Sequence, residues 1–193
     1  MSPAPSRFVS RAGEKLDAAL DAFDLDVSGR CCADFGCNVG GFTDCLLRRG
    51  ARKVYALDTG YGQLAWTLRR DERIVAMERT NALYCPVPEL VGCVVCDVGW
   101  TCQRRVVPAA MNWLAADGLA VSLLKPHYEL TKLRGRKPRS ALTDAESEDV
   151  CRRVCEELAA LCRVRAVCRS PLRGKGGNVE YLLWLEPAGG QTG

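Results

Sequence analysis

Histidine and long apolar runs are what this sequence has least of. Its 193 residues include one histidine, His127, which leaves little imidazole for a metal site. No run of about eighteen apolar residues could cross a membrane as a helix, and residues 1–10 lack the apolar segment of a signal peptide. From these absences we expect a soluble, cytoplasmic protein with neither a metal centre nor a membrane contact.

Internal repeats are also lacking, and the length suits one folding unit. With 48% hydrophobic residues, the chain can bury a core of its own without a second domain. We expect a single domain over residues 1–193, with flexible ends at 1–9 and 187–193.

Cysteine, by contrast, is abundant, with 12 in the chain. Most of them lie inside apolar runs, where a free thiol behaves as a small buried hydrophobe. The pair Cys93-x-x-Cys96 allows a zinc or redox interpretation. It lies in an expected strand that cannot readily turn both sulfurs onto one ion, and no second pair follows at zinc-finger spacing. Packing is therefore the favoured role.

Apolar strand patterns alternate with helical patterns along the whole chain. The expected strands are residues 31–35, 53–58, 73–77, 90–97, 119–124, 164–169 and 178–185, and the expected helices are 10–23, 41–49, 63–70, 106–116 and 143–162. Ser10 is expected to cap the first helix, and Thr143 with Glu146 to form a capping box on the last. This order predicts an α/β fold with a doubly wound, mostly parallel, seven-stranded sheet and an antiparallel edge hairpin.

The stretch Asp34-Phe35-Gly36-Cys37-Asn38-Val39-Gly40-Gly41 joins the first expected strand to a helix. Its spacing differs from the G-x-G-x-x-G of dinucleotide sites. Glycines leave the backbone bare beside a ligand, and a leading acid suits a cationic or amino-acid-bearing group better than a pyrophosphate. S-adenosylmethionine meets that description. A strand-turn-helix corner with glycines for packing is the alternative.

A second acid, Asp58, ends the next expected strand 24 residues after Asp34. In doubly wound sheets an acid about 20 residues past the glycine turn accepts hydrogen bonds from a ribose diol. Asn81 lies just past the third strand, where it could read an adenine edge. A helix cap or a solvated strand end is the alternative for Asp58, but two acids at consecutive strand ends favour a nucleoside ligand.

A cluster of basic residues lies in residues 131–140, which have no apolar period: Lys132, Arg134, Arg136, Lys137 and Arg139. Such a run is usually a solvated, flexible loop. Because it follows a strand that ends at Lys125, it would lie over the proposed site and attract a phosphate backbone.

Four charged residues stand where strand ends or an early helical turn would bring them to one rim: Lys15, Asp97, Lys125 and Glu180. Burying a charge without a partner is costly, so the two lysines and two acids are expected to satisfy one another. On the residues alone, a structural salt-bridge network is the simpler interpretation.

Several stretches resemble known RNA methyltransferases. Ser10-Arg11-Ala12-x-x-Lys15-Leu16 resembles the opening of FtsJ-like ribose 2′-O-methyltransferases. Residues 40–47, 54–66 and 78–82 look like the TlyA (haemolysin-like) rRNA methyltransferases, as do Leu124-Lys125-Pro126 and Gly177-Asn178-Val179-Glu180. The resemblance extends from about Phe8 to Leu185.

This resemblance implies a class I, Rossmann-like methyltransferase that uses S-adenosylmethionine to methylate RNA, with ribosomal RNA or a ribosomal subunit as the expected partner. The family's Lys-Asp-Lys-Glu tetrad falls on Lys15, Asp97, Lys125 and Glu180. The implied cofactor residues are Asp34, Gly36, Cys37, Asn38, Gly40, Gly41, Phe42, Asp58, Asn81 and Asp97. The implied RNA-binding residues are Arg11, Lys132, Arg134, Arg136, Lys137, Arg139, Arg173 and Lys175.

The tetrad suits methylation of a ribose hydroxyl. Displacement at a sulfonium methyl needs an aligned nucleophile and removal of its proton. A neighbouring cation and partial burial favour the neutral form of an amine, so Lys15 beside Lys125 would let Lys125 act as general base. Asp97 and Glu180 would orient the two amines.

The sequence also departs from the TlyA pattern. TlyA proteins usually carry an N-terminal RNA-binding module, yet only nine residues precede Ser10. Val98-Gly99-Trp100 follows Asp97 where TlyA proteins usually have Ser-Phe, and Cys37-Asn38-Val39 fills the glycine turn. Two other functions therefore stay open: a methyltransferase acting on a small molecule or a protein, and a catalytically silent S-adenosylmethionine- or RNA-binding factor in ribosome assembly.

Overall fold

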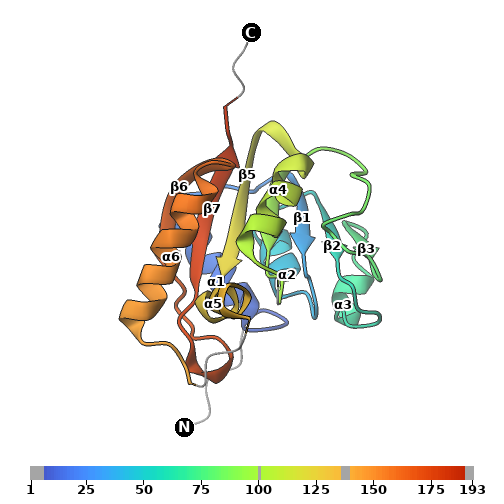
Figure 1. Ribbon diagram of the computed structural model, residues 1–193. Coiled ribbons are helices and arrows are strands. Elements are labelled where there is room, and N and C mark those ends of the chain that lie inside the picture. The colour runs from blue at the N-terminus through green and yellow to red at the C-terminus, as the bar shows by residue number, and fades with distance from the viewer. Residues whose placement is uncertain (1–6, 100, 136–139, 190–193) are drawn as a thin grey trace.

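The computed structural model describes residues 7–99, 101–135 and 140–189. A seven-stranded sheet forms its centre, in the order β3-β2-β1-β4-β5-β7-β6 (Figure 1). The strands are β1 Cys31–Phe35, β2 Lys53–Leu57, β3 Ile74–Met77, β4 Val91–Cys96, β5 Leu114–Leu124, β6 Cys162–Arg169 and β7 Tyr181–Pro187. Strands β1 to β5 pair in parallel, whereas β7 runs antiparallel to both β5 and β6. The predicted sheet, including its antiparallel edge hairpin, is confirmed.

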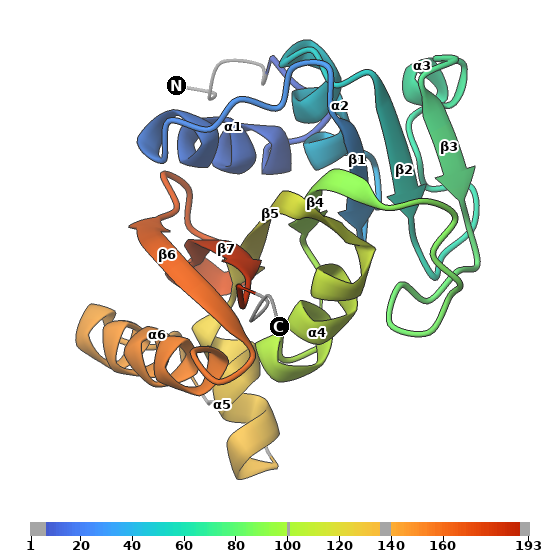
Figure 2. The same ribbon diagram turned by 90° about the horizontal axis from the view of Figure 1, so that it is seen from above.

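Helices cover both faces of this sheet. They are α1 Ala12–Ala22, α2 Gly41–Arg48, α3 Trp66–Arg69, α4 Gln103–Trp113, α5 Pro126–Arg134 and α6 Asp144–Leu158, with a 3-10 turn, η1, at Lys175–Gly177. Seen from above, α1, α2 and α3 lie on one side and α4, α5 and α6 on the other (Figure 2). None of the described helices is long and apolar enough to cross a membrane.

The central strands are mostly apolar because each of their faces packs on a helical layer. All five residues of β1 are buried. Phe35 belongs to the core under α4 and α6, whereas Cys32 belongs to the core under α1 and α2. Residues 1–6 and 190–193, within the ends predicted to be flexible, lie outside the described residues, and Phe8 is buried in the second of these cores.

The cysteines pack as the sequence indicates. All 12 are free, and no cluster of candidate metal ligands occurs in residues 7–99, 101–135 and 140–189. Cys93 and Cys96 lie on opposite faces of β4, in different cores, so one ion cannot bind both sulfurs.

Several predicted helix boundaries are wrong. Helix α3 begins only at Trp66, and α6 ends at Leu158, so that Cys162 already belongs to β6. Residues 114–116 were expected to be helical, but they begin β5, where Val91 pairs with Leu114 and a bulge precedes the pair Cys93–Leu119. The pairing with β4 overrides the helical preference of the alanines. Helix α1 has Arg11 at its N-cap without a side-chain cap bond, and Ser10 contributes its carbonyl instead, accepting from the Gly13 amide at 3.1 Å.

The basic segment also differs from its prediction. Residues 131–134 belong to α5, which begins with Pro126 at its first position. Proline fits that position because its missing N–H has no helical acceptor there. The predicted loop is thus in part a helix, and residues 136–139 lie outside the described residues.

Candidate active site

The proposed site residues meet at one edge of the sheet because of strand direction. Parallel strands β1, β2 and β4 end there. Asp34 is the next-to-last residue of β1, and Asp58 and Asp97 directly follow β2 and β4. Lys125 follows β5 at the same edge. Glu180 precedes β7, and because β7 runs the other way, its start reaches the same edge as the ends of its neighbours.

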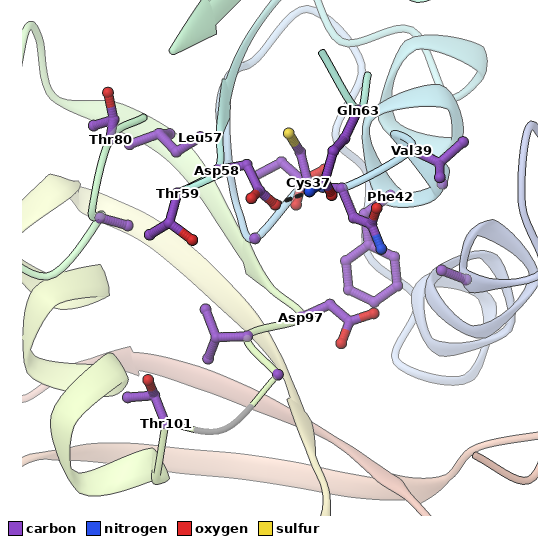
Figure 3. Close-up of a pocket in the computed structure, with 18 of the residues that line it drawn as sticks. Cys37, Val39, Phe42, Leu57, Asp58, Thr59, Gln63, Thr80, Asp97 and Thr101 are labelled. Atoms are coloured by element: carbon purple, nitrogen blue, oxygen red, sulfur yellow. Dashed lines mark hydrogen bonds between the residues drawn. The ribbon is translucent and has the colours of Figure 1, made fainter. Parts of the chain in front are cut away.

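A cavity of about 360 Å³ opens at this edge. That volume lies within the range of small-molecule sites, about 300–1,000 Å³. The side chains of Cys37, Phe42, Asp58 and Asp97 surround it, from four different segments (Figure 3). Of the predicted cofactor residues, all but Gly40 line it: Asp34, Gly36, Cys37, Asn38, Gly41, Phe42, Asp58, Asn81 and Asp97.

The three glycines of the turn face three different neighbours. Gly36 has a φ of +84°, and a Cβ there would approach the Asp97 carbonyl to 2.8 Å, so it keeps the ends of β1 and β4 together. Gly40, with a φ of +100°, would run into the side chains of Leu64 and Leu68 instead. Its place in the predicted cofactor set is therefore not supported by the cavity, because its open side packs against the segment leading into α3. Gly41 lines the cavity but also meets α1.

Asp34 is fully buried, and only one of its two carboxylate oxygens has a hydrogen-bond partner in the described part of the chain. Its Oδ2 accepts from the Thr43 hydroxyl at 2.7 Å, whereas Oδ1 has no hydrogen-bond partner among the described residues. Burial raises the pKa of Asp34 to about 7, with Asp97 adding to the rise and the Thr43 hydrogen bond opposing it. A buried acid with an open oxygen on a cavity suits a cationic group of a ligand.

Asp58 joins two loops of the cavity wall. Its carboxylate accepts from the backbone amides of Asn38 at 2.9 Å and Gly60 at 2.7 Å. A carboxylate has about four acceptor positions, so lone pairs remain for hydroxyl donors. Asn81 turns its Oδ1 to the Leu83 amide at 3.0 Å, which leaves its amide nitrogen for other acceptors.

The four tetrad residues form two ion pairs. The Lys15 Nζ lies 2.5 Å from the Glu180 Oε2, with 12% and 3% of the two side chains exposed. The Lys125 Nζ pairs with the Asp97 Oδ1, and these side chains are 14% and 21% exposed. Each of these four charged side chains thus has an opposite charge in contact.

A second cavity, of about 300 Å³, adjoins the first and shares Ser10, Ala12 and Lys125 with it. Lys15, Lys125 and Glu180 line it, so three of the four tetrad residues face this space. Arg11 and Arg173 line it as well. Gly174 lies against the Glu180 carboxylate so closely that a Cβ would overlap the Oε1 atom.

The predicted RNA-binding residues are divided among three places. Arg11 and Arg173 are exposed at the second cavity, and Lys132 is exposed on α5, away from it. Arg134 and Lys175 are described only by their backbone, and Arg136, Lys137 and Arg139 lie outside the described residues.

Sequence reasoning missed part of both linings. Thr59, Gln63, Thr80 and Thr101 line the first cavity, and His127, Tyr128, Leu172 and Gly174 line the second. A position two or three residues past a strand end could have indicated Thr59 and His127. The loop bearing Leu172 and Gly174 carried no such signal, because its path depends on tertiary contacts.

Comparisons with known proteins point to one family. The family model described as FtsJ-like methyltransferase matches residues 8–187. The 16S/23S rRNA (cytidine-2'-O)-methyltransferase TlyA of Mycobacterium tuberculosis is 43% identical over 185 residues, covering 92% of this chain and 68% of that protein.

Solved structures give the same result for the fold. A hemolysin-type protein from Lactococcus lactis superimposes with a TM-score of 0.88 at 34% identity, covering 96% of this chain and 91% of the other. The N-methyltransferase NodS from Bradyrhizobium japonicum reaches a TM-score of 0.63 at 14% identity, covering 93% and 96%, and so shares the fold alone. The predicted methyltransferase-type sheet is confirmed.

Proposed function

The chain belongs to the FtsJ-like methyltransferase family, and on that premise we propose that it transfers a methyl group from S-adenosylmethionine to a ribose 2′-hydroxyl of RNA, in particular ribosomal RNA. The observation that carries the proposal is the pair of ion pairs, Lys15–Glu180 and Lys125–Asp97, at the junction of two cavities. The rRNA methyltransferase activity in the name of the M. tuberculosis relative points to the same acceptor.

The first cavity has side chains that would suit S-adenosylmethionine. Asp34 would accept from the ammonium of the methionine moiety, and Asp58 from the ribose diol, while Phe42 and Leu57 supply apolar surface. When bound, the cofactor supplies an electrophilic methyl group on a sulfonium. Asp97 lines this cavity and pairs with Lys125. The proposed base, Lys125, would therefore lie next to the methyl group of the cofactor.

The second cavity would hold the acceptor. Lys15, Lys125 and Glu180 line this second cavity, and Lys125 also lines the first. Lys125 would take the proton from the 2′-hydroxyl after its own proton has left, and Asp97 would keep the amine aimed at the acceptor. Lys15, held by Glu180, would hydrogen-bond the ribose and steady the developing negative charge on the oxygen.

RNA is favoured over a small-molecule acceptor by the charges around that cavity. Arg11 and Arg173 flank it with exposed side chains. The Arg173 guanidinium also pairs with Asp144 at 3.1 Å and donates to the Gly177 carbonyl at 2.9 Å. Guanidinium forks match phosphate geometry. A polynucleotide puts phosphates on both sides of the reacting ribose, whereas a small neutral acceptor has no use for two such groups.

The decisive experiment follows labelled methyl from S-adenosylmethionine into deproteinised RNA and into intact ribosomal subunits. We expect incorporation into nucleotides whose 3′ phosphodiester resists alkali, since cleavage by alkali needs a free 2′-hydroxyl. Lys125→Met should lower the rate by at least about a hundredfold while S-adenosylhomocysteine still binds. Lys53→Met is the matched control, because Lys53 also pairs with a carboxylate, that of Glu89, outside both cavities.

Two results would contradict the proposal. Label in alkali-labile nucleotides would indicate base methylation, and an unchanged rate in Lys125→Met would remove Lys125 as base. Cofactor binding without transfer to any RNA would favour a binding protein instead.

A further inference from the structure

Glu129 is a buried carboxylate that neither cavity of the active site uses. It lies in α5 one turn after Lys125, and 8% of it is exposed. Its Oε1 accepts from the backbone amide of Gln103 at 2.8 Å. Gln103 is the first residue of α4, so a carboxylate from one helix caps the start of another.

Gln103 is itself fixed at both ends of its side chain. Its Oε1 accepts from the Ser122 hydroxyl at 2.7 Å, and its Nε2 donates to the Leu123 carbonyl at 3.2 Å. Ser122 and Leu123 are near the end of β5, and Gln103 is 2% exposed. The start of α4 is therefore tied to β5 through its side chain and to α5 through its backbone.

These ties surround the Lys125–Asp97 ion pair. The Lys125 carbonyl accepts from the amides of Tyr128 at 2.9 Å and Glu129 at 3.3 Å, so Lys125 is bound to the first turn of α5. Asp97, Val98, Gly99 and Thr101 line the first cavity. They belong to the segment of residues 97–102 that leads into Gln103, in which Trp100 lies outside the described residues. The Glu129–Gln103 bond therefore joins the helix that follows Lys125 to the helix that follows the Asp97 segment.

We infer that Glu129 is a positioning residue that clamps the end of segment 97–102 against α5 and thereby fixes Asp97 relative to Lys125. The part of this inference that concerns catalysis rests on the proposed function. A carboxylate at a helix start satisfies an N–H that the helix leaves open and interacts favourably with the helix dipole. Because the bond is buried, its loss leaves the Gln103 amide without its acceptor in a site largely removed from solvent, which is costly.

The proposed role of Glu129 requires only that its side chain accept a hydrogen bond from the Gln103 amide. A glutamine side chain has a carbonyl oxygen at the same distance from the backbone, so Glu129→Gln can keep the bond to the Gln103 amide. Glu129→Ala removes it. Glu157 gives a matched control, because it lies with Glu129 on a separate outer cavity of about 310 Å³ between α4, α5 and α6, and its side chain is 43% exposed.

The first measurement needs no RNA. S-adenosylhomocysteine affinity is measured by calorimetry for the full chain and its variants, and exchange of the Gln103 amide is followed by NMR. We expect Glu129→Ala to weaken binding by about tenfold and to speed exchange at Gln103, while Glu129→Gln and Glu157→Ala stay within about twofold of the parent. If the alanine variant binds like the parent, or if the glutamine variant is as impaired as the alanine variant, the clamp is wrong.

The second measurement addresses catalysis. In methyl transfer to RNA, Glu129→Ala should lower kcat by about tenfold and leave KM for RNA unchanged, with recovery in Glu129→Gln. A rise in KM for RNA at unchanged kcat would overturn the positioning role. If the parent binds S-adenosylhomocysteine but methylates no RNA, the proposed function fails while the binding comparison still decides the clamp.

Discussion

The Asp34 Oδ1 is a buried atom that has no hydrogen-bond partner among the described residues, so a ligand should supply a donor to it. The acid is fully buried, and burial raises its pKa from 3.8 to about 7. Between pH 3.8 and about pH 7, Asp34 therefore keeps its proton in the folded, ligand-free protein, whereas it has already lost it in the unfolded chain. This contribution to stability is present at low pH and is lost as pH rises to about 7.

Cofactor binding should reverse that balance. An ammonium placed at Oδ1 favours the carboxylate, so binding releases a proton, and affinity rises with pH up to about 7 and then levels off. We expect this dependence for S-adenosylhomocysteine, measured by calorimetry in buffers of different ionisation enthalpy. Asp34→Asn should bind more weakly and lose the pH dependence below 7. The same slope in Asp34→Asn would assign the titration to another group.

Gly174 offers a test of the Glu180 position. Its φ of −74° and ψ of −172° suit any residue, so an alanine there meets no backbone strain. The added Cβ would overlap the Glu180 carboxylate and push it away from Lys15. We expect Gly174→Ala to fold normally and to lose about tenfold or more in methyl transfer.

The control for that change is Gly92→Ala, whose Cβ would have ordinary contacts of 3.4 Å and more with Arg30. Normal activity in Gly174→Ala would mean that Glu180 tolerates displacement and is not needed for catalysis.

Residues at strand ends could be placed from the sequence, and Lys15 on α1 could be placed as well, whereas Glu129 and Gln103 could not. Asp34, Asp58 and Asp97 each follow an apolar run, and that pattern fixes which edge of a parallel sheet they reach. Glu129 and Gln103 fall outside the helices that the sequence predicts, although the structure places them in α5 and α4. Their burial arises only when α4 and α5 pack together, so no local pattern reveals their bond.

At the scale of elements, prediction succeeded where local signals and packing agree. The Thr143–Glu146 capping box is present, with the Glu146 amide donating to the Thr143 hydroxyl at 3.2 Å and the Glu146 carboxylate accepting from the Thr143 amide at 2.8 Å. Prediction failed where strand pairing or a proline at a helix start determined the secondary structure. The start of β5 is set by β4, and α5 continues into a segment whose charges indicated a loop.

The capping box gives a prediction confined to stability. Thr143→Ala should lower the free energy of unfolding by about 1 kcal/mol, measured in urea, because α6 loses the acceptor at its first turn. Thr143→Ser keeps the hydroxyl and should stay close to the parent. Helix α6 lines neither active-site cavity, so both variants should methylate RNA at the parent rate, and a loss of activity in either would show that α6 is coupled to the site.

At the scale of the whole molecule, the reversed direction of β7 is what completes the site. With β7 parallel, Glu180 would lie at the opposite edge of the sheet from Lys15. The sequence indicated an edge hairpin but not that β7 inserts between β5 and β6. That insertion depends on the pairing of β7 with residues 120–124 of β5, about sixty positions earlier in the chain, which single-sequence patterns do not report.

The division into two cavities predicts that cofactor and RNA contacts can be changed separately. Arg11 and Arg173 line only the second cavity, so replacing either with alanine should weaken RNA binding and leave S-adenosylhomocysteine affinity unchanged. Each lost phosphate contact should also reduce the slope of log K against log salt by about 0.7 for single-stranded RNA. Arg152→Ala is the control, since Arg152 is an exposed arginine of α6 that pairs with Asp149 and Glu156, and its salt slope should match the parent's. Equal losses in all three variants would mean that net charge alone governs RNA binding, and a loss of cofactor affinity in the first two would mean that the cavities act as one site.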